Sequence, residues 1–259
     1  MFDAAPTAAE LSNISIFRCS NCMRAESCFG AALDGAICNR HGESLPVLDI
    51  FARGKHLYSV DDKVEQIYIV RSGAVKTYHL TADGEEQIVG FHLPGDVVGI
   101  DAVATGTFQS SAVAIAVTEV CRLPISAIHG RSAESLSFRQ AVLGGVGREI
   151  QRLHRLLYLE RCTAEQRLAA FLLGHARKLP KSGGVSGAAK MAVMLPMSRA
   201  DIGKFLDLAT ETVSRMFSKL QSAGIIAVHG AEVELIDLAT LQTYASAAQQ
   251  TVSRRSKVH

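Results

Sequence analysis

The sequence predicts an α+β fold in three parts: an antiparallel β-roll, one long helix, and a small helical domain that ends in a β-hairpin. Three observations support this prediction. Short apolar runs separated by turn residues fill positions 45–123, an apolar stripe with helical spacing follows at 138–157, and two helix-capping signatures come after it. With 259 residues, 48% of them hydrophobic, the chain is long enough for two ordinary globular cores.

The composition excludes some classes of protein. The first 18 residues hold Asp3 and Glu10 and no apolar run that would suit a signal peptide, and no stretch approaches the ~20 apolar residues of a membrane span. We therefore expect a cytoplasmic protein, whose clustered cysteines are metal ligands or redox thiols. Residues 1–163 carry 15 Lys/Arg and 18 Asp/Glu (net −3), whereas residues 164–259 carry 12 and 7 (net +5). This basic last third is a mild sign of a polyanionic partner, and a random surface imbalance explains the charge equally well.

Three cysteines near the N-terminus form the first candidate site. Cys19, Cys22 and Cys28 lie within ten residues and have no strand or helix period around them. We therefore expect a loop on which the three thiolates converge on one metal centre. The spacing alone leaves open what this centre is.

The β-roll is predicted from alternating runs and the turns between them. Ser72-Gly73 and Ala82-Asp83-Gly84 are turn signals, the second of them typical of a hairpin. The expected strands are residues 66–71, 74–80, 87–91, 111–117 and 120–123. Many short antiparallel strands at this spacing favour a small barrel or roll.

A single apolar stripe predicts the long helix. The members of this stripe are Phe138, Val142, Val146, Ile150, Leu153 and Leu157. They are separated by 4, 4, 4, 3 and 4 residues, which is the spacing of one face of a helix. So long and narrow a stripe favours a seam with a second copy of the helix, and hence a parallel homodimer, over a helix that lies on its own barrel. Gly144, Gly145 and Gly147 each weaken this helix by about 1 kcal/mol relative to alanine. We therefore expect a marginal seam.

Two capping boxes introduce a helix-turn-helix. Thr163-Ala-Glu-Gln166 opens one helix and Ser198-Arg-Ala-Asp201 opens another. A further helix begins at Thr210 after a short turn, and Gly203 is small where these last two helices would cross. Their shared core is expected from Ile202, Phe205, Leu206, Val213, Phe217 and Leu220. Residues 225–235 then form a hairpin, which makes the domain a winged helix.

The outer face of the helix that begins at Thr210 has the chemistry of a major-groove reader. Its outward residues are Thr210, Glu211, Ser214, Arg215 and Lys219. An arginine fork can bond guanine O6 and N7 together, and a carboxylate can accept from cytosine N4. The hydroxyl and ammonium groups would reach phosphates or further base edges. Together with the wing and the basic charge, this face favours DNA binding over the solvated surface of an ordinary helical pair.

Over nearly its whole length the sequence resembles the CRP–FNR superfamily of transcription regulators, and its FNR branch in particular. The residues that carry the resemblance are Cys19, Cys22, Cys28, Gly84–Gly99, Ala164–Phe171 and Thr210–Arg215. It implies a cyclic-nucleotide-binding-like β-roll, a dimerisation helix and a winged helix-turn-helix. We expect a flexible tail (1–18), a cysteine loop (19–30), a β-roll sensor domain (31–136), the dimerisation helix (137–162), the DNA-binding domain (163–248) and a basic tail (249–259).

The resemblance also implies one oxygen-labile [4Fe–4S] cluster per subunit. Its ligands would be Cys19, Cys22, Cys28 and a fourth thiolate from the end of the barrel, the place at which Cys121 falls. By spacing alone Cys38 is an equally plausible fourth ligand. Iron–sulfur clusters accept three clustered thiolates and a remote one, whereas four-cysteine zinc sites usually come as two close pairs, and the second pair is missing here.

By the same resemblance, Glu211, Ser214 and Arg215 match base-reading residues and imply a palindrome of TTGAT-like half-sites. A homodimer would place its two recognition helices ~10 bp apart. The hairpin tip Thr81–Glu85 matches a surface that touches RNA polymerase in relatives, with Asp83, Gly84 and Glu85 as the contact residues. An ordinary solvated turn is the equally favoured alternative. Where cyclic-nucleotide receptors carry an arginine for the phosphate, this chain has Gln109-Ser110-Ser111, so we expect no cyclic nucleotide.

These features predict an anaerobic, DNA-binding transcription regulator that activates or represses genes of low-oxygen metabolism and is not an enzyme. One alternative is a cluster-free regulator of the same superfamily whose cysteines bind zinc or sense redox state. An iron–sulfur enzyme or electron carrier is less favoured, because electron carriers have denser cysteine runs and the nine histidines form no nucleophile–base arrangement.

Overall fold

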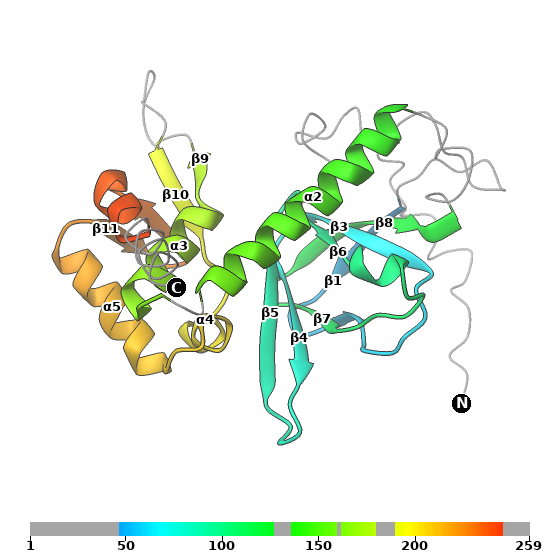
Figure 1. Ribbon diagram of the computed structural model, residues 1–259, viewed down its shortest axis with the longest axis horizontal. Coiled ribbons are helices and arrows are strands. Elements are labelled where there is room, and N and C mark those ends of the chain that lie inside the picture. Colours follow the sequence, from blue (N-terminus) through cyan, green and yellow to red (C-terminus); the bar gives the residue numbers. More distant parts are fainter. Residues whose placement is uncertain (1–46, 127–135, 160–161, 180–189, 246–259) are drawn as a thin grey trace, which may run out of the picture. The chain divides into compact units, whose positions relative to one another are not determined.

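The computed structural model describes residues 47–126, 136–159, 162–179 and 190–245 (Figure 1). The chain divides into two compact units between Glu149 and Ile150, within a long helix, except that the short segment Glu86–Ile88 groups with the second unit. No helix among the described residues combines the length and the apolar character that a membrane span requires.

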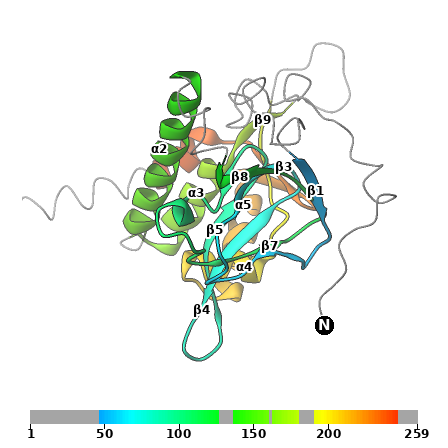
Figure 2. The same cartoon turned by 90° about the vertical axis from the view of Figure 1, so that its right-hand side faces the viewer.

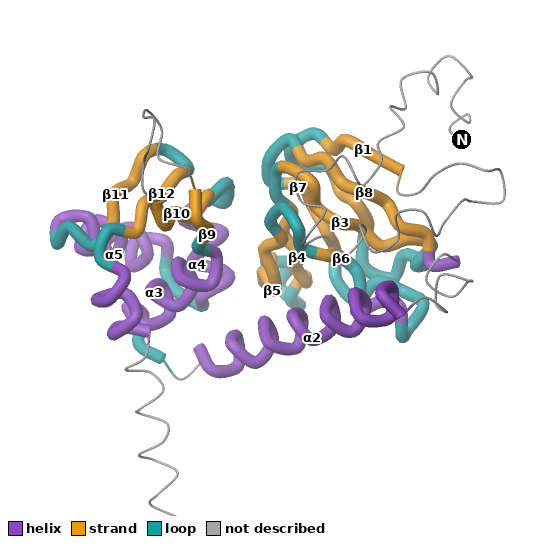
Figure 3. The backbone as a smooth tube through the Cα atoms, turned by 90° about the horizontal axis from the view of Figure 1, so that it is seen from above, coloured by secondary structure: helices purple, strands orange, loops and turns teal. Residues whose placement is uncertain are grey.

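The first unit is built from two four-stranded antiparallel sheets. Its elements are β1 (Val47–Phe51), β2 (His56–Tyr58), β3 (Gln66–Ser72), β4 (Val75–Leu80), β5 (Glu86–His92), β6 (Val97–Val98), the 3₁₀ turn η5 (Asp101–Val103), β7 (Ser111–Ala114) and β8 (Thr118–Pro124). One sheet has the strand order β1-β8-β3-β6, and the other has the order β2-β7-β4-β5. This arrangement confirms the predicted antiparallel roll, whose strands are the orange group around β3 and β8 in Figure 3.

The predicted hairpin turn between β4 and β5 is also confirmed. The backbone N–H of Thr81 donates to the carbonyl of Glu85 at 2.9 Å, and the N–H of Gly84 donates to the carbonyl of Thr81 at 2.9 Å. In Figure 2 this turn projects beyond the other strands of the roll. The strands that the sequence did not predict are the shortest or lie at an edge, and β6 with its two residues offers no periodic pattern to read.

Aromatic side chains fill the interior of the roll. The rings of Tyr58 and Phe108 stack with centroids 3.6 Å apart and an angle of 8° between their planes, and Tyr68 lies against Tyr58 at 5.9 Å. Gly99 approaches the same stack, because a Cβ atom on it would lie 2.6 Å from the Phe108 ring. Burial in this setting raises the pKa of the Tyr58 hydroxyl, so the phenol stays protonated.

The long helix α2 spans Leu136–Leu159 and confirms the prediction from the apolar stripe. It ends two residues beyond the last member of that stripe, Leu157. The N–H of Cys162 donates to the carbonyl of Leu159 at 2.9 Å. Phe138, the first member of the predicted stripe, has a side chain outside the described part.

The second unit contains a helix-turn-helix and a four-stranded sheet of order β11-β12-β10-β9. Its elements are α3 (Ala164–His175), β9 (Arg177–Leu179), β10 (Lys190–Met194), α4 (Arg199–Leu206), α5 (Thr210–Ser222), β11 (Ile226–His229) and β12 (Glu232–Leu235). Both predicted capping boxes are present, with Thr163 and Gln166 at the start of α3 and Ser198 and Asp201 at the start of α4.

The core of the second unit follows the prediction with two differences. Met216 is buried in α5 although the sequence reading did not include it. Phe205 is only half-buried, and its ring lies 5.8 Å from that of Phe171 on α3. Phe205 thus packs toward α3, while Ile202 and Leu206 supply the fully enclosed face of α4.

Candidate nucleic-acid interface

The turn between α4 and α5 fixes where the second helix begins. Asp207 adopts the left-handed conformation with φ 53° and ψ 54°, which reverses the chain after Leu206. The chain then passes so close to α4 that a Cβ atom on Gly203 would lie 2.6 Å from the carbonyl oxygen of Leu208. Only glycine leaves room for this approach, and the small residue predicted at the crossing therefore has a defined structural role.

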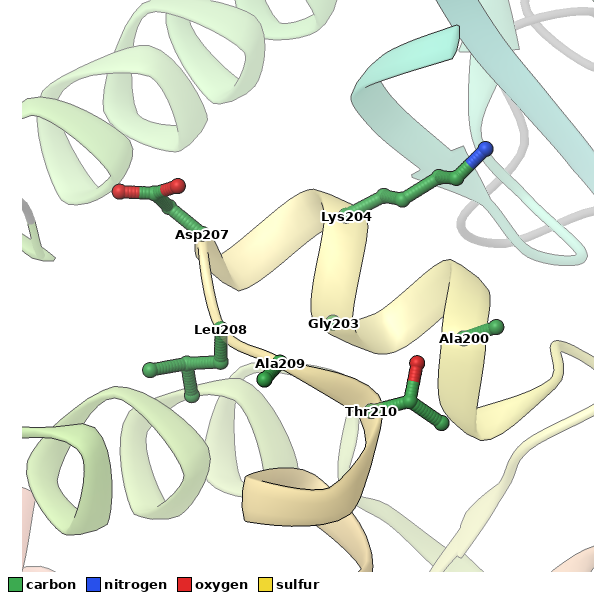
Figure 4. A pocket seen from close by; sticks show the side chains of 7 residues that line it. All are labelled: Ala200, Gly203, Lys204, Asp207, Leu208, Ala209 and Thr210. Carbon is green, nitrogen blue, oxygen red and sulfur yellow. The ribbon is translucent and has the colours of Figure 1, made fainter. Parts of the chain in front are cut away.

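A shallow hollow lies over this turn (Figure 4). Its lining residues are Ala200, Gly203, Lys204, Asp207, Leu208, Ala209 and Thr210. In Figure 4 the hydroxyl of Thr210 is directed toward α4, whereas the charged ends of Lys204 and Asp207 point outward. The hollow thus has two charged groups of opposite sign at its rim.

Helix α5 has one buried apolar face and one exposed polar face. Val213, Met216, Phe217 and Leu220 are buried. All five residues predicted to face DNA are exposed, and they are Thr210, Glu211, Ser214, Arg215 and Lys219. The helix therefore presents the predicted polar groups together on one side.

One of these five residues already has a partner in the protein. The Nζ of Lys219 donates a hydrogen bond to Oε1 of Glu165, in the first turn of α3. This bond raises the pKa of the Lys219 ammonium. Lys219 is therefore directed toward α3, an arrangement that the sequence reading missed because the two residues lie 54 positions apart.

The N-terminus of α5 differs from those of α3 and α4. Its N-cap residue is Ala209, which provides no side-chain hydrogen bond to the first turn. The first N–H groups of a helix have no partner within the helix, and they form the positive end of its dipole. This end of α5 therefore has donors that suit a phosphate oxygen.

Arg199 connects the two helices of the motif. Its guanidinium carbon lies 3.4 Å from the centroid of the Phe217 ring, which joins the start of α4 to the buried face of α5. Burial at this position lowers the pKa of Arg199 from its ordinary value. The predicted wing follows α5 as β11 and β12, and Leu195 donates to the carbonyl of Ala231 in the turn between them at 2.7 Å.

The predicted dimer seam lies along an exposed apolar row of α2. The exposed fractions are 38% for Val146, 48% for Ile150, 46% for Leu153 and 63% for Leu157, and Val142 is half-buried. Large apolar side chains in a contiguous exposed row are unusual for a surface that stays in water.

The candidate cluster ligands are divided between described and undescribed residues. Cys19, Cys22, Cys28 and the alternative Cys38 lie outside the described residues. Cys121 lies inside β8, half-buried, where it is paired with Leu48 of β1 and Ile69 of β3. Within the described ranges no three histidine, cysteine or acidic side chains come together as a metal site.

The hairpin tip predicted to meet RNA polymerase is accessible. Asp83, Gly84 and Glu85 are all exposed in the turn between β4 and β5.

Two protein families match the chain. The cyclic nucleotide-binding domain matches residues 49–130 and the Crp-like helix-turn-helix domain matches residues 166–244. The transcriptional regulatory protein btr of Bordetella pertussis is 37% identical over 225 residues, which is 86% of this chain and 91% of that protein. The fumarate and nitrate reduction regulatory protein of Escherichia coli is 36% identical over 179 residues, 69% of this chain and 70% of that protein.

The structure of FixK2 from Bradyrhizobium japonicum is similar to this one, with a TM-score of 0.67 and 32% identity. The match covers 78% of this chain and 98% of that chain. These relatives agree with the predicted fold, including the β-roll and the helix-turn-helix, and they are regulators rather than enzymes.

Gly203 offers a direct test of the turn geometry. Gly203→Ala would place a methyl group against the Leu208 carbonyl, and we expect it to lower the free energy of unfolding by roughly 1–3 kcal/mol. The matched control is Gly174→Ala in α3, where nothing lies within 4 Å of the added atom. That change should raise stability by about 0.5–1 kcal/mol, because alanine is the better helix former. Urea unfolding followed by circular dichroism measures both, and equal effects of the two changes would contradict the assignment.

Proposed function

The chain belongs to the CRP/FNR family of transcription regulators, and on this premise we propose that it is an oxygen-responsive regulator that reads a TTGAT-like palindrome as a homodimer. Its helix-turn-helix domain is a DNA-binding domain, and members of the family are dimeric. The observation that supports the proposal most is the polar face of α5, with Glu211, Ser214 and Arg215 exposed beside one another.

These three residues have complementary roles on a duplex. The guanidinium of Arg215 can bond guanine O6 and N7 together, and the carboxylate of Glu211 can accept from cytosine N4. The uncapped N-terminus of α5, with Thr210 beside it, would hold a backbone phosphate and so fix the register of the helix on DNA. Lys219 would need to exchange Glu165 for a phosphate before it could contribute.

The base-reading role predicts a loss of discrimination when Arg215 is removed. Arg215→Ala should weaken binding to the TTGAT-like palindrome by about 1–3 kcal/mol while binding to a scrambled duplex changes little. Fluorescence anisotropy on anaerobic protein at one fixed salt concentration measures both affinities. Gln221→Ala, which changes another exposed residue of α5, should leave them unchanged. An Arg215→Ala protein with the discrimination of the unsubstituted chain would exclude this role.

We propose that the seam between subunits is the exposed apolar row of α2: Val142, Val146, Ile150, Leu153 and Leu157. These residues recur on one face of the helix, and a second copy of the same row would remove them from water. Association of this kind is two-fold, so each residue near the axis meets its own copy.

The two-fold arrangement makes the seam sensitive to charge. Leu153→Glu would bring two carboxylates together, and like charges at an interface cost several kcal/mol. We expect the dimer dissociation constant to rise at least about 100-fold, measured by sedimentation equilibrium without oxygen. Gln151→Glu adds the same charge to another exposed position of α2 and should leave the dimer intact. Equal dissociation constants for the two variants would place the seam elsewhere.

We further propose one [4Fe–4S] cluster per subunit, held by Cys19, Cys22, Cys28 and Cys121. The described ligand fits this role. Cys121 is a half-buried thiol on a strand that is paired on both sides, and its cross-strand neighbours Leu48 and Ile69 provide an apolar, sulfur-compatible setting. When bound, the cluster would supply an oxygen-labile link between the cysteine loop and β8. A change of about 5.5 kcal/mol in the free energy of association is enough to move the monomer–dimer equilibrium from 1:99 to 99:1.

The cluster proposal is tested by Cys121→Ala. We expect the anaerobically purified variant to lose its iron, its sulfide and its visible absorbance, together with binding to the palindrome. Cys162→Ala, at a buried cysteine after α2, should keep all of them, and Cys38→Ala should too. If Cys121→Ala keeps its iron and sulfide and Cys38→Ala loses them, the fourth ligand is Cys38 and not Cys121. Bound zinc without sulfide in the unsubstituted protein would favour the zinc or thiol alternative.

We also propose that the β-roll acts without a cyclic nucleotide. The Tyr58–Phe108 stack occupies its interior, and Gln109 is bonded to the carbonyl of Thr107 in the position where a phosphate-binding cation would be needed. The exposed tip at Asp83–Glu85 is the proposed contact with RNA polymerase. The proposed division of the chain into domains is the one expected from the sequence, with residues 163–248 as the DNA-binding domain. The proposed location of the protein is the cytosol.

A further inference from the structure

Arg167, on α3 and outside the proposed DNA-reading face, joins three backbone carbonyls of the second unit. Its Nε donates to the carbonyl of Cys162 at 3.1 Å. Its Nη1 donates to the carbonyl of Leu206 at 2.7 Å and to that of Asp207 at 3.3 Å. The side chain is only 17% exposed. Its bonds to Cys162 and Leu206 are partly buried, whereas the bond to Asp207 is exposed. One guanidinium thus connects segments that lie 39 and 40 residues away in the chain.

The two ends of this connection are both structural junctions. Cys162 lies three residues after the end of α2, its N–H bonds the carbonyl of Leu159, and Thr163 after it caps α3. Its carbonyl therefore marks the joint between α2 and α3. Leu206 and Asp207 are the end of α4 and the left-handed residue of the turn, three residues before α5 begins at Thr210.

Arginine suits this position better than lysine. The last carbonyls of a helix lack partners within it and form the negative end of its dipole. A guanidinium offers several N–H donors in a fixed plane and can serve carbonyls on two sides, whereas an ammonium is a point charge on a flexible stem. The ion pair of Arg167 with Asp207, at 3.9 Å, adds little, because that carboxylate is fully exposed.

We propose that Arg167 is a positioning residue that holds the turn before α5 to the α2–α3 joint, and so sets the orientation of the recognition helix relative to the end of α2. This inference rests on the proposed DNA-binding dimer. In such a dimer the end of α2 is the reference from which each recognition helix is placed, and the separation of the two helices selects the spacing of the half-sites. A looser turn would leave the base-reading groups intact while it relaxed this selection.

The experiment compares Arg167→Met, Arg167→Lys and the unsubstituted full-length protein, all kept anaerobic. Three duplexes are used: a TTGAT-like palindrome, the same palindrome with one added central base pair, and a single half-site. For Arg167→Met we expect about tenfold weaker binding to the correct palindrome, a reduced preference over the lengthened one, and little change on the half-site. Arg167→Lys should restore part of the spacing preference.

A control separates positioning from general loss of stability. Leu241→Ala removes a fully buried side chain from the helical residues 238–245 of the same unit. It should lower the unfolding midpoint but leave the spacing preference unchanged. A second readout needs no DNA: amide exchange of Leu208, whose N–H bonds the carbonyl of Gly203 at 2.9 Å, should be faster in both Arg167 variants than in Leu241→Ala.

Unchanged spacing preference and unchanged Leu208 exchange in Arg167→Met would overturn the inference. If that variant does not fold, Arg167→Lys decides by the same two measurements. Failure of the unsubstituted protein to prefer the palindrome over scrambled DNA would instead overturn the proposed function. The amide exchange rate of Leu208 would still show whether Arg167 stabilises the turn.

Discussion

The close approach of the Leu208 carbonyl to Gly203 is the constraint on which the DNA-binding unit depends. It requires a residue without a side chain on α4 and a left-handed residue at Asp207, and it sets the point from which α5 leaves the turn. The contacts that surround it act on the same geometry. Arg199, at the start of α4, covers the Phe217 ring, and Arg167 binds the backbone carbonyls at the end of α4. The exposed polar face of α5 is therefore placed by residues that lie outside that face.

Aromatic rings pack the interior of the β-roll. Tyr58, Tyr68 and Phe108 fill it, and Gly99 brings the backbone against the last of these rings. Close packing of this kind makes the roll a rigid support. Cys121 lies on β8, an inner strand of one sheet, so a ligand bound there would be attached to a strand that is hydrogen-bonded on both sides.

Local features of the fold could be predicted from the sequence, and distant contacts could not. Both capping boxes depend on residues three positions apart, and α2 depends on a repeated spacing, so the pattern and its physical cause lie in one short stretch. The partners of Lys219 and Arg167 come from other helices, and no periodicity reveals them. The sequence pattern therefore predicts Lys219 as an outward cation and indicates no functional role for Arg167.

The ion pair of Lys219 with Glu165 has a consequence for the electrolyte around the protein. A lysine in solution attracts mobile anions, and DNA phosphates hold mobile cations that are set free when a protein neutralises them. Lys219 instead carries an anion that belongs to its own chain. If phosphate replaced Glu165, the displaced carboxylate would remain beside the duplex and would itself retain cations. A phosphate contact made by Lys219 would then set free fewer ions than the same contact made by a lysine with no carboxylate beside it.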